Sequence, residues 1–276
     1  MKTITFEQIA NSLGSLIDKS LRSVEPNALS LLQNARTTEN NENAKWAIDT
    51  ICENARICAN DKSYPCQDCG LAIIFATVGN RLVIDCNLND AINEGVRRGY
   101  ASARKSVAHP LTRINTNDNT PAIIYTELTT SDTLTLSFLA KGAGSENMSR
   151  TYMLTPSKGE EGIVSAVVDC VLSAGANPCP PLVLGVGVGG TLDKACYLSK
   201  KALLRNSGQP NPDKNVAILE QKILSAVNNT NVGVQGLGGN NTALAVHIET
   251  FPTHIGMLPV AITIQCHSVR HGSIIL

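Results

Sequence analysis

Three cysteines that lie far apart in the chain each stand in or at the start of a loop that could bind a ligand. Cys66 begins the segment CQDCG, Cys179 lies in the segment NPCPP, and Cys266 begins the segment CHSVR. Glycine lets the backbone approach a ligand closely, and proline fixes the chain. A thiol in such a loop is well placed to bind a metal ion, although Cys179 on its own would also suit a buried structural cysteine.

Side chains able to hold a carboxylate or move a proton lie beside two of these cysteines and in one further loop. Gln67 and Asp68 follow Cys66 directly, and Arg270 ends the segment that Cys266 begins. The fixed fork of an arginine suits a carboxylate. His254 follows a proline and a threonine and could donate a proton or contact an anion, although it could equally be an ordinary surface or core histidine.

Other chemistries of the cysteines are less favoured by the sequence. Cys66 and Cys69 have the spacing of a zinc or redox pair, but no second pair lies at short spacing and a strand, not a helix, is expected next. Nine cysteines is an odd number, and a disulfide framework is typical of small secreted chains. Four cysteines in apolar helical segments are predicted to be packing residues: Cys52, Cys58, Cys170 and Cys196.

The run Gly185–Gly190 matches the G-x-G-x-x-G pattern of dinucleotide-binding loops. The acidic residue expected about 20 positions later is missing, since that region reads RNSG. We therefore interpret the run as a close turn rather than a nicotinamide site.

Hydrophobic periodicity indicates the elements that must position these loops. Residues 5–60 are predicted to be helical, and 71–78 and 82–85 to form a hairpin around Gly79-Asn80. Further helices are expected at 88–105, 160–174, 191–204 and 214–227, and further strands at 122–128, 134–139, 182–188, 242–249 and 259–265. This pattern predicts an α+β fold with mixed, largely antiparallel sheets packed with helices. We expect a single domain, 1–276, with a helical N-terminal region at 1–60 and the binding core at 61–276.

Composition excludes several classes of protein. The 23 basic and 23 acidic residues balance, whereas a nucleic-acid-binding protein needs surplus positive charge. No apolar run approaches the roughly 18 residues that span a membrane. The N-terminus has the pattern of an amphipathic helix rather than a signal peptide, so we expect a cytoplasmic protein.

Taken together, the loops resemble one family from about residue 40 to the C-terminus. They are similar to the signature of the alpha subunit, or N-terminal domain, of class I fumarases and tartrate dehydratases. The matching segments are PCQD at 65–68, NDNTPA at 117–122, KGAGSEN at 141–147, NPCPP at 177–181, GVGGT at 187–191, and Cys266 with Arg270.

This resemblance implies a [4Fe-4S] cluster held by Cys66, Cys179 and Cys266, with one iron open to act as a Lewis acid. It implies that a small dicarboxylate substrate is held by Gln67, Asp68, Arg104, Gly144, His254 and Arg270, with His254 and Asp68 as catalytic residues. One departure is Cys69, which stands where the family usually has threonine; we interpret it as a small neutral replacement rather than a redox-sensitive thiol.

The resemblance also implies a beta subunit that supplies the catalytic base and further substrate contacts, in an alpha2beta2 assembly. The expected reaction is the reversible hydration of fumarate to malate, and the alternative within the class is dehydration of L(+)-tartrate to oxaloacetate. Outside the class, a non-catalytic iron–sulfur scaffold or redox sensor, a zinc-dependent hydrolase and a nicotinamide dehydrogenase remain as alternatives.

Overall fold

The computed structural model describes residues 2–276, which form two compact units. Unit 1 is made from the residues up to Val24, Ile57–Ala143 and Arg270–Leu276, and unit 2 from Glu25–Arg56 and Gly144–Val269. The single domain expected from the sequence stays a prediction, because a division into compact units does not by itself define separate domains. Because each unit is assembled from segments that are distant in the chain, neither is bounded by a linker that composition could reveal.

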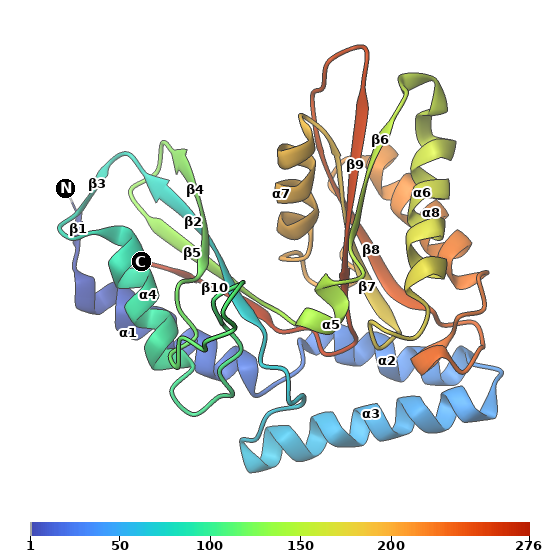
Figure 1. Ribbon diagram of the computed structural model, residues 1–276, viewed down its shortest axis with the longest axis horizontal. Coiled ribbons are helices and arrows are strands. Elements are labelled where there is room, and N and C mark those ends of the chain that lie inside the picture. The colour runs from blue at the N-terminus through green and yellow to red at the C-terminus, as the bar shows by residue number, and fades with distance from the viewer. Residues whose placement is uncertain (1) are drawn as a thin grey trace. The chain divides into compact units, whose positions relative to one another are not determined.

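Unit 1 contains a four-stranded sheet in the order β10-β5-β2-β4 (Figure 1). Its elements are β1 (Lys2–Ile4), α1 (Phe6–Leu21), β2 (Leu71–Gly79), β3 (Leu82–Ile84), α4 (Leu88–Gly99), β4 (Ile123–Thr129), β5 (Leu134–Lys141) and β10 (His271–Ile275). β5 is antiparallel to β2 and β10, and β4 is parallel to β2. Apolar residues of α1, α4 and the sheet form the core of this unit.

Glycines allow α1 and α4 to pack closely. A Cβ on Gly99 would lie 2.5 Å from Cβ of Ile17, and a Cβ on Gly95 would lie 2.9 Å from Cβ of Leu13. Small residues at such a contact let two helix backbones approach more closely than larger side chains would permit. α1 itself begins at a capping box in which Thr5 and Gln8 satisfy each other's backbone N–H groups.

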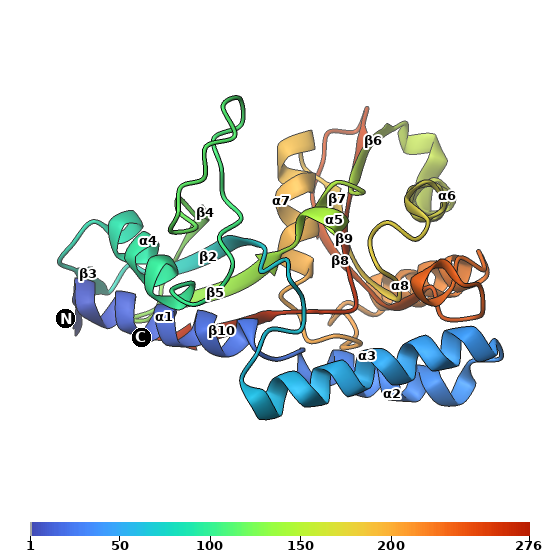
Figure 2. The same cartoon turned by 60° about the horizontal axis from the view of Figure 1, so that its bottom comes forward.

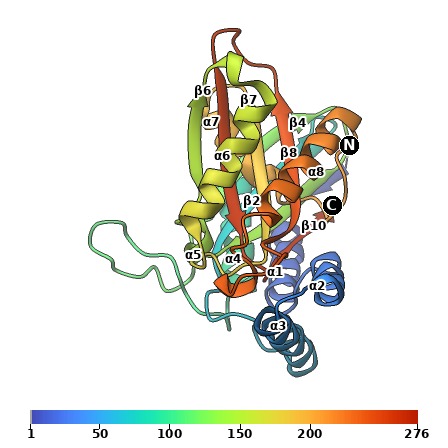
Figure 3. The same cartoon turned by 90° about the vertical axis from the view of Figure 1, so that its right-hand side faces the viewer.

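Unit 2 contains a second four-stranded sheet in the order β6-β9-β7-β8. Its elements are α2 (Pro26–Thr38), most of α3 (Glu42–Asp61), α5 (Ala143–Glu146), β6 (Arg150–Leu154), η1 (Pro156–Lys158), α6 (Gly159–Ala174), β7 (Leu182–Gly189), α7 (Leu192–Ala202), α8 (Lys214–Asn228), η2 (Val234–Gly236), β8 (Ala243–Phe251) and β9 (Leu258–Gln265). β9 is antiparallel to β6 and β7, and β8 is parallel to β7. Figure 3 shows α6 and α8 lying across one face of this sheet.

The alternation of residues along β7 explains its glycine-rich run. Leu184 and Val186 point into the apolar core that β7 shares with α6 and α8. Gly185 and Gly187 face α7 on the opposite side, and a Cβ on Gly185 would lie 2.1 Å from the carbonyl oxygen of Ser199. The G-x-G spacing therefore lets a helix lie directly on a strand. The interpretation of this run as a close turn is wrong, because Gly185 to Gly189 continue strand β7.

The α+β class and the helical N-terminal region are confirmed, and two predicted elements are wrong. β2 and β3 do not form a hairpin: β3 pairs with β1 in parallel, and β2 pairs with β4 and β5. The helix predicted for 88–105 ends at Gly99, and residues 100–122 form a long loop. β6 and β10 were not predicted, because each is a short strand with no clear alternation of its own.

No helix within residues 2–276 is both long enough and apolar enough to cross a membrane.

Candidate functional site

The Cys66 loop of unit 1 is held in place by the side chain of Asp68. Its Oδ1 accepts a hydrogen bond from the backbone N–H of Gly70 (2.8 Å), and its Oδ2 accepts one from the N–H of Ala143, at the end of β5 (2.7 Å). The N–H of Asp68 lies 3.4 Å from Sγ of Cys66 and donates to it. Hydrogen bonds to sulfur are among the contacts by which proteins tune thiolate ligands. This loop therefore suits a ligating cysteine.

Arg270 lies against the same loop and is 1% exposed. Its Nη2 donates to the backbone carbonyl of Asp68 over 2.8 Å. Its Nε and Nη1 are buried, and no hydrogen-bond partner for them lies within the part of the chain that the structure describes. A buried cation with unused donors is costly unless an anion is bound nearby, so the structure gives Arg270 the properties of an anion-binding residue.

The phenol of Tyr100, which lies near Arg270, is also affected by burial. Tyr100 is fully buried and donates its hydroxyl to the carbonyl of Cys69 (3.2 Å). Burial raises the pKa of Tyr100 well above its ordinary value, although the nearby Arg270 opposes the shift. Cys69 is 1% exposed and belongs to the apolar core of unit 1, which fits a small neutral residue.

Gln67 and Arg104 are both exposed. Arg104 lies in the loop between α4 and β4, which extends away from the strands of unit 1 in Figures 2 and 3. Asn119, which is fully buried, ties this loop to the Cys66 loop: its Nδ2 donates to the carbonyl of Gly70 (3.1 Å), and its Oδ1 accepts from the N–H of Ser106 (2.7 Å). Asn119 adopts a positive φ of 65°, a conformation that asparagine tolerates better than most residues.

Unit 2 brings Cys179 and Cys266 to the same end of its sheet. Cys179 precedes β7 and Cys266 follows β9, and the antiparallel register pairs Val183 with Gln265. The N–H of His267 lies 3.5 Å from the carbonyl oxygen of Cys179, so the two loops are directly linked. Cys179 is exposed and Cys266 is half-buried.

The backbone of Cys179 is unusual. Its φ is 56°, in the left-handed region that residues other than glycine seldom occupy. Backbone outliers of this kind persist only where the surrounding structure enforces them, and they cluster at functional sites. The conformation of Cys179 is therefore consistent with a ligand held in a fixed position.

Gly144 lies near the Cys179 loop, whereas His254 does not. A Cβ on Gly144 would lie 3.7 Å from the carbonyl oxygen of Asn177. His254 follows β8, and the parallel register pairs Gly189 with Phe251, at the other end of the sheet from Cys179. Eight residues of strand separate the two ends, a span of about 25 Å at roughly 3.3 Å per residue. Within unit 2, then, His254 and the two cysteines do not share one site.

His254 instead lines a pocket of about 570 Å³ together with Thr191, Lys194, Phe251 and other residues. Its Nδ1 accepts a hydrogen bond from the N–H of Gly256 (3.1 Å), so the N–H of the ring lies on Nε2 and can donate a hydrogen bond. The exposed imidazole can therefore contact an anion, but not one bound beside Cys179 of the same unit.

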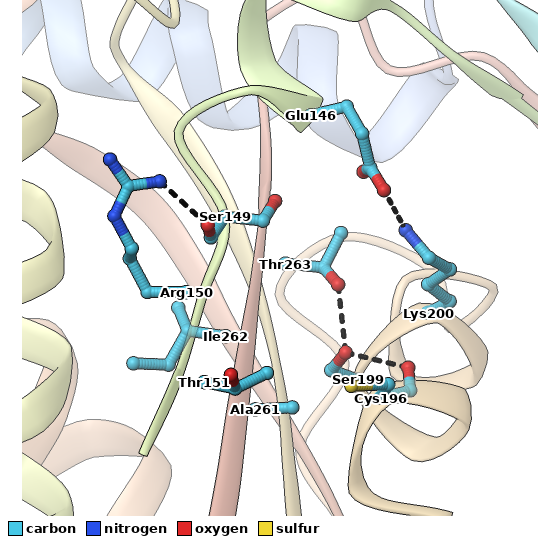
Figure 4. Close-up of a pocket in the computed structure, with 10 residues that line it drawn as sticks. All are labelled: Glu146, Ser149, Arg150, Thr151, Cys196, Ser199, Lys200, Ala261, Ile262 and Thr263. Atoms are coloured by element: carbon cyan, nitrogen blue, oxygen red, sulfur yellow. Dashed lines mark hydrogen bonds and ion pairs between the residues drawn. The ribbon is translucent and has the colours of Figure 1, made fainter. Parts of the chain in front are cut away.

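A second polar pocket of unit 2, about 370 Å³ in volume, lies between α7 and strands β6 and β9 (Figure 4). Two of its hydroxyl groups are hydrogen-bonded to each other, since Oγ of Ser199 lies 2.7 Å from Oγ1 of Thr263. The hydroxyl of Ser199 also donates to the carbonyl of Cys196. Lys200 forms an ion pair with Glu146. Burial raises the pKa of Cys196, so its thiol stays protonated, as expected for a packing residue.

The remaining cysteines also behave largely as packing residues. Cys58 and Cys170 are buried, and burial raises the pKa of Cys170 to about 11. Cys52 is half-buried in α3, and burial raises its pKa too. A thiol whose pKa is raised by burial stays protonated and is a poor metal ligand, which fits Cys52 and Cys170 as packing residues.

The donor set fits an iron–sulfur cluster in its chemistry. Thiolates are the usual ligands of such clusters. Cys66 accepts a hydrogen bond at its sulfur, and Cys179 has an enforced backbone conformation. Cys66 belongs to unit 1 and the other two cysteines to unit 2. No group of three or more His, Cys, Asp or Glu side chains placed to hold a metal ion occurs among residues 2–276, so the three-cysteine site remains a prediction.

Comparison with known proteins shows the family to which the chain belongs. Residues 10–275 match the profile of the fumarate hydratase (Fumerase) family. The chain is 40% identical over 250 residues to a putative L(+)-tartrate dehydratase subunit alpha of Methanocaldococcus jannaschii, covering 87% of this chain and 88% of that protein. It is 28% identical over 251 residues to the L(+)-tartrate dehydratase subunit alpha of Escherichia coli K12, covering 89% and 83% respectively. The chain therefore belongs to the fumarate hydratase (Fumerase) family, a family of hydro-lyases.

Proposed function

We propose that this chain is the alpha subunit of an iron–sulfur-dependent hydro-lyase that reversibly hydrates fumarate to malate. Family membership supports the reaction class. The observation that carries the proposal is the buried guanidinium of Arg270, which has two unused donors and is bonded to the loop of a candidate ligand, Cys66. An arginine of this kind is suited to a substrate carboxylate.

Cys66, Cys179 and Cys266 are the proposed ligands of a [4Fe-4S] cluster. When bound, the cluster would supply a Lewis-acidic iron that polarises the C–O bond broken in dehydration. The chain's own contribution is to hold the thiolates. Asp68 supports the sulfur of Cys66 through its backbone N–H, and the backbone bond between His267 and Cys179 keeps the other two loops together.

The substrate dicarboxylate is proposed to bind through Gln67, Arg104 and Arg270 in unit 1 and through the backbone near Gly144 in unit 2. Two arginines can neutralise two carboxylates, and the planar guanidinium fixes the orientation of each. Asp68 has a supporting role, since both carboxylate oxygens accept backbone hydrogen bonds. A direct catalytic role for Asp68 requires that one oxygen also exchange a proton with the substrate or with water.

Dehydration also needs a base that removes a proton from the carbon next to the one that loses its hydroxyl. We propose that a beta subunit supplies this base and further substrate contacts, in an alpha2beta2 assembly. The names of the relatives as alpha subunits support a partner chain. His254 stays a proposed substrate contact, but its place at the far end of the unit 2 sheet means that it would serve a carboxylate bound at that end or at another chain's site.

Dehydration of L(+)-tartrate is the second candidate. The relatives from Methanocaldococcus jannaschii and Escherichia coli both carry that activity in their names. Malate and tartrate differ by one hydroxyl, so the same arginines and the same Lewis acid could serve either substrate. A non-catalytic iron–sulfur scaffold would retain the cluster but dehydrate neither compound.

The test is to purify the chain anaerobically together with its partner subunit and to assay dehydration of malate and of L(+)-tartrate. The proposal predicts a brown complex that converts malate to fumarate faster than it converts tartrate, and that loses activity when iron is removed by a chelator. Faster conversion of tartrate would favour the second candidate. A complex that is active with no iron, or a brown one that dehydrates neither compound, would contradict the proposal.

A further inference from the structure

A glycine-rich loop of unit 2, residues 231–241, lies against the segment that carries Cys179. Gln235 donates two hydrogen bonds to the carbonyl oxygen of Pro180, one from its backbone N–H (2.9 Å) and one from its side-chain Nε2 (2.6 Å). Gly236 fits closely against the same segment, because a Cβ there would lie 2.5 Å from Cβ of Ala176. The peptide group between Pro180 and Pro181, one residue beyond Cys179, is thus held by a residue more than fifty positions away.

The loop is shaped by backbone conformations that most residues avoid. Gln235 has a φ of 53° and Gly236 one of 77°. Gly233 and Gly238 lie so close that a Cβ on Gly233 would be 1.8 Å from the carbonyl oxygen of Gly238. The N–H of Gly233 also donates to Oγ1 of the buried Thr242 (3.0 Å). Such a compact loop presents the amide of Gln235 in a fixed orientation.

A buried carboxylate anchors the other end of the loop. Glu39 is 4% exposed, and its Oε1 accepts hydrogen bonds from the N–H groups of Asn41 (3.0 Å) and Asn240 (3.2 Å). Its Oε2 accepts one from Nδ2 of Asn241 (2.8 Å). Gly239 leaves room for this carboxylate, since a Cβ there would lie 2.3 Å from Oε1. The helical segment around Glu39 and the loop are therefore joined to each other.

Cys179 needs support of this kind. With a φ of 56°, it is in a conformation that relaxes unless other contacts enforce it. Its N–H donates to the carbonyl of Ala176 (3.0 Å), and its own carbonyl accepts from His267. The third restraint is the pair of bonds from Gln235 to the carbonyl of Pro180, which fixes the peptide group between Pro180 and Pro181, directly after the Cys179 peptide.

We infer that Gln235 is a positioning residue for the proposed cluster: it holds the carbonyl of Pro180, the residue after Cys179, so that the thiolate is already in place when iron binds. The inference rests on the proposed function and adds a residue that contacts neither the thiol nor the substrate. A preorganised ligand loses less conformational freedom on binding. Without the Gln235 side chain, the cluster should bind less tightly while the fold is retained.

The experiment uses the full chain with two variants, Gln235→Leu and Gln235→Glu. Leucine removes the Nε2 donor, and a glutamate carboxylate places an acceptor against the carbonyl oxygen of Pro180. Gln221→Leu in α8 is the matched control, because that side chain is exposed and Gln221 lies outside the loop. After anaerobic reconstitution, iron release to a chelator is followed by the loss of visible absorption, and thermal unfolding of the iron-free chains is recorded in parallel.

Iron release is expected to be about five-fold faster in Gln235→Leu, the factor that corresponds to about 1 kcal/mol for one hydrogen bond, and faster still in Gln235→Glu. Gln221→Leu should match the wild type. Unchanged release rates in both Gln235 variants would overturn the inference. So would a fall in the thermal midpoint of the iron-free variants large enough to explain the iron loss by unfolding alone.

A separate measurement keeps this test independent of the proposed function. In the iron-free chains, the alkylation rate of Cys179 is measured by peptide mass spectrometry. Gln235→Leu should change that rate by at least two-fold, with the rate at Cys66 unaltered. If the wild type binds no iron, the proposed function fails, and the alkylation result alone decides whether Gln235 positions Cys179; equal rates in wild type and variant would refute it.

Discussion

Arg270 combines an observed structural contact with a proposed role in binding the substrate. One of its N–H groups is bonded to the backbone of Asp68, and the burial of the whole side chain leaves Nε and Nη1 without a partner among the described residues. Unsatisfied donors on a buried cation are tolerated in proteins mainly where an anion completes them. Arg270 therefore links the Cys66 loop to the substrate carboxylate in the proposed mechanism.

The first prediction concerns Arg270→Lys. Lysine keeps the charge but not the fork, so the complex should dehydrate malate about 100-fold more slowly, as expected for the loss of two charge-assisted hydrogen bonds at about 1.5 kcal/mol each. Steady-state kinetics and thermal unfolding are measured together, with Arg56→Lys on the exposed surface of α3 as the control. Activity within two-fold of the wild type, with an unchanged thermal midpoint, would remove Arg270 from the substrate site.

At this scale the sequence predicted which residues would carry the chemistry, but not which contacts hold them in place. The cysteine loops were recognised because reactive side chains stand beside glycine and proline. Asp68, however, is bonded to Ala143, which is 75 positions away in the chain. Gln235 was missed altogether, since a glutamine in a glycine-rich run carries no signal that it reaches Pro180. Partners that only the fold brings together leave no local pattern.

At the scale of elements, two sheets determine where the loops end. The antiparallel pairing of β7 and β9 places Cys179 and Cys266 at one edge of the unit 2 sheet, and the parallel pairing of β7 and β8 places His254 at the other edge. Apolar periodicity predicted these strands well, but pairing partners depend on contacts distant in sequence. The same limit explains the wrong hairpin at β2 and β3. A turn sequence joins these two strands, but β3 pairs with β1 instead of with β2.

The second prediction concerns the join between α2 and the loop 231–241. Burial opposes ionisation of Glu39, but hydrogen bonds from Asn241, Asn41, Asn240 and Asn40 outweigh it and hold the pKa of Glu39 below its ordinary value. A carboxyl with a lowered native pKa adds stability at neutral pH, and this stability is lost as the pH falls through that pKa. The iron-free chain should therefore become less stable between about pH 5 and about pH 3.

Glu39→Gln tests this, because glutamine cannot ionise and replaces one acceptor by a donor. The variant should be about 1–3 kcal/mol less stable than the wild type at pH 7, and the difference should shrink as the pH is lowered. Urea unfolding at several pH values measures both. Glu42→Gln, three residues along on the exposed surface and ion-paired with Lys45, is the control. A difference that stays constant with pH would show that ionised Glu39 does not anchor the loop.

At the scale of the whole molecule, two units share one chain that passes between them several times. Composition could not reveal this division, because two of the passages fall inside helices α3 and α5 and the others lie in short loops rather than in a flexible linker. Family resemblance, by contrast, extended over almost the whole chain and predicted the class of reaction that the comparisons support. The proposed cluster takes ligands from both units, so iron binding would depend on the chain as a whole.

The proposal that Cys66, Cys179 and Cys266 hold an iron–sulfur cluster is tested most directly by the iron and sulfide content of the anaerobically purified chain and of four single variants. Cys66→Ser, Cys179→Ser and Cys266→Ser are each predicted to lose the cluster and its visible absorption. Cys196→Ser should keep both at the wild-type level, because burial raises the pKa of that thiol and its α7 position serves packing. Equal iron content in all four variants, or a colourless wild type that carries zinc, would contradict the account.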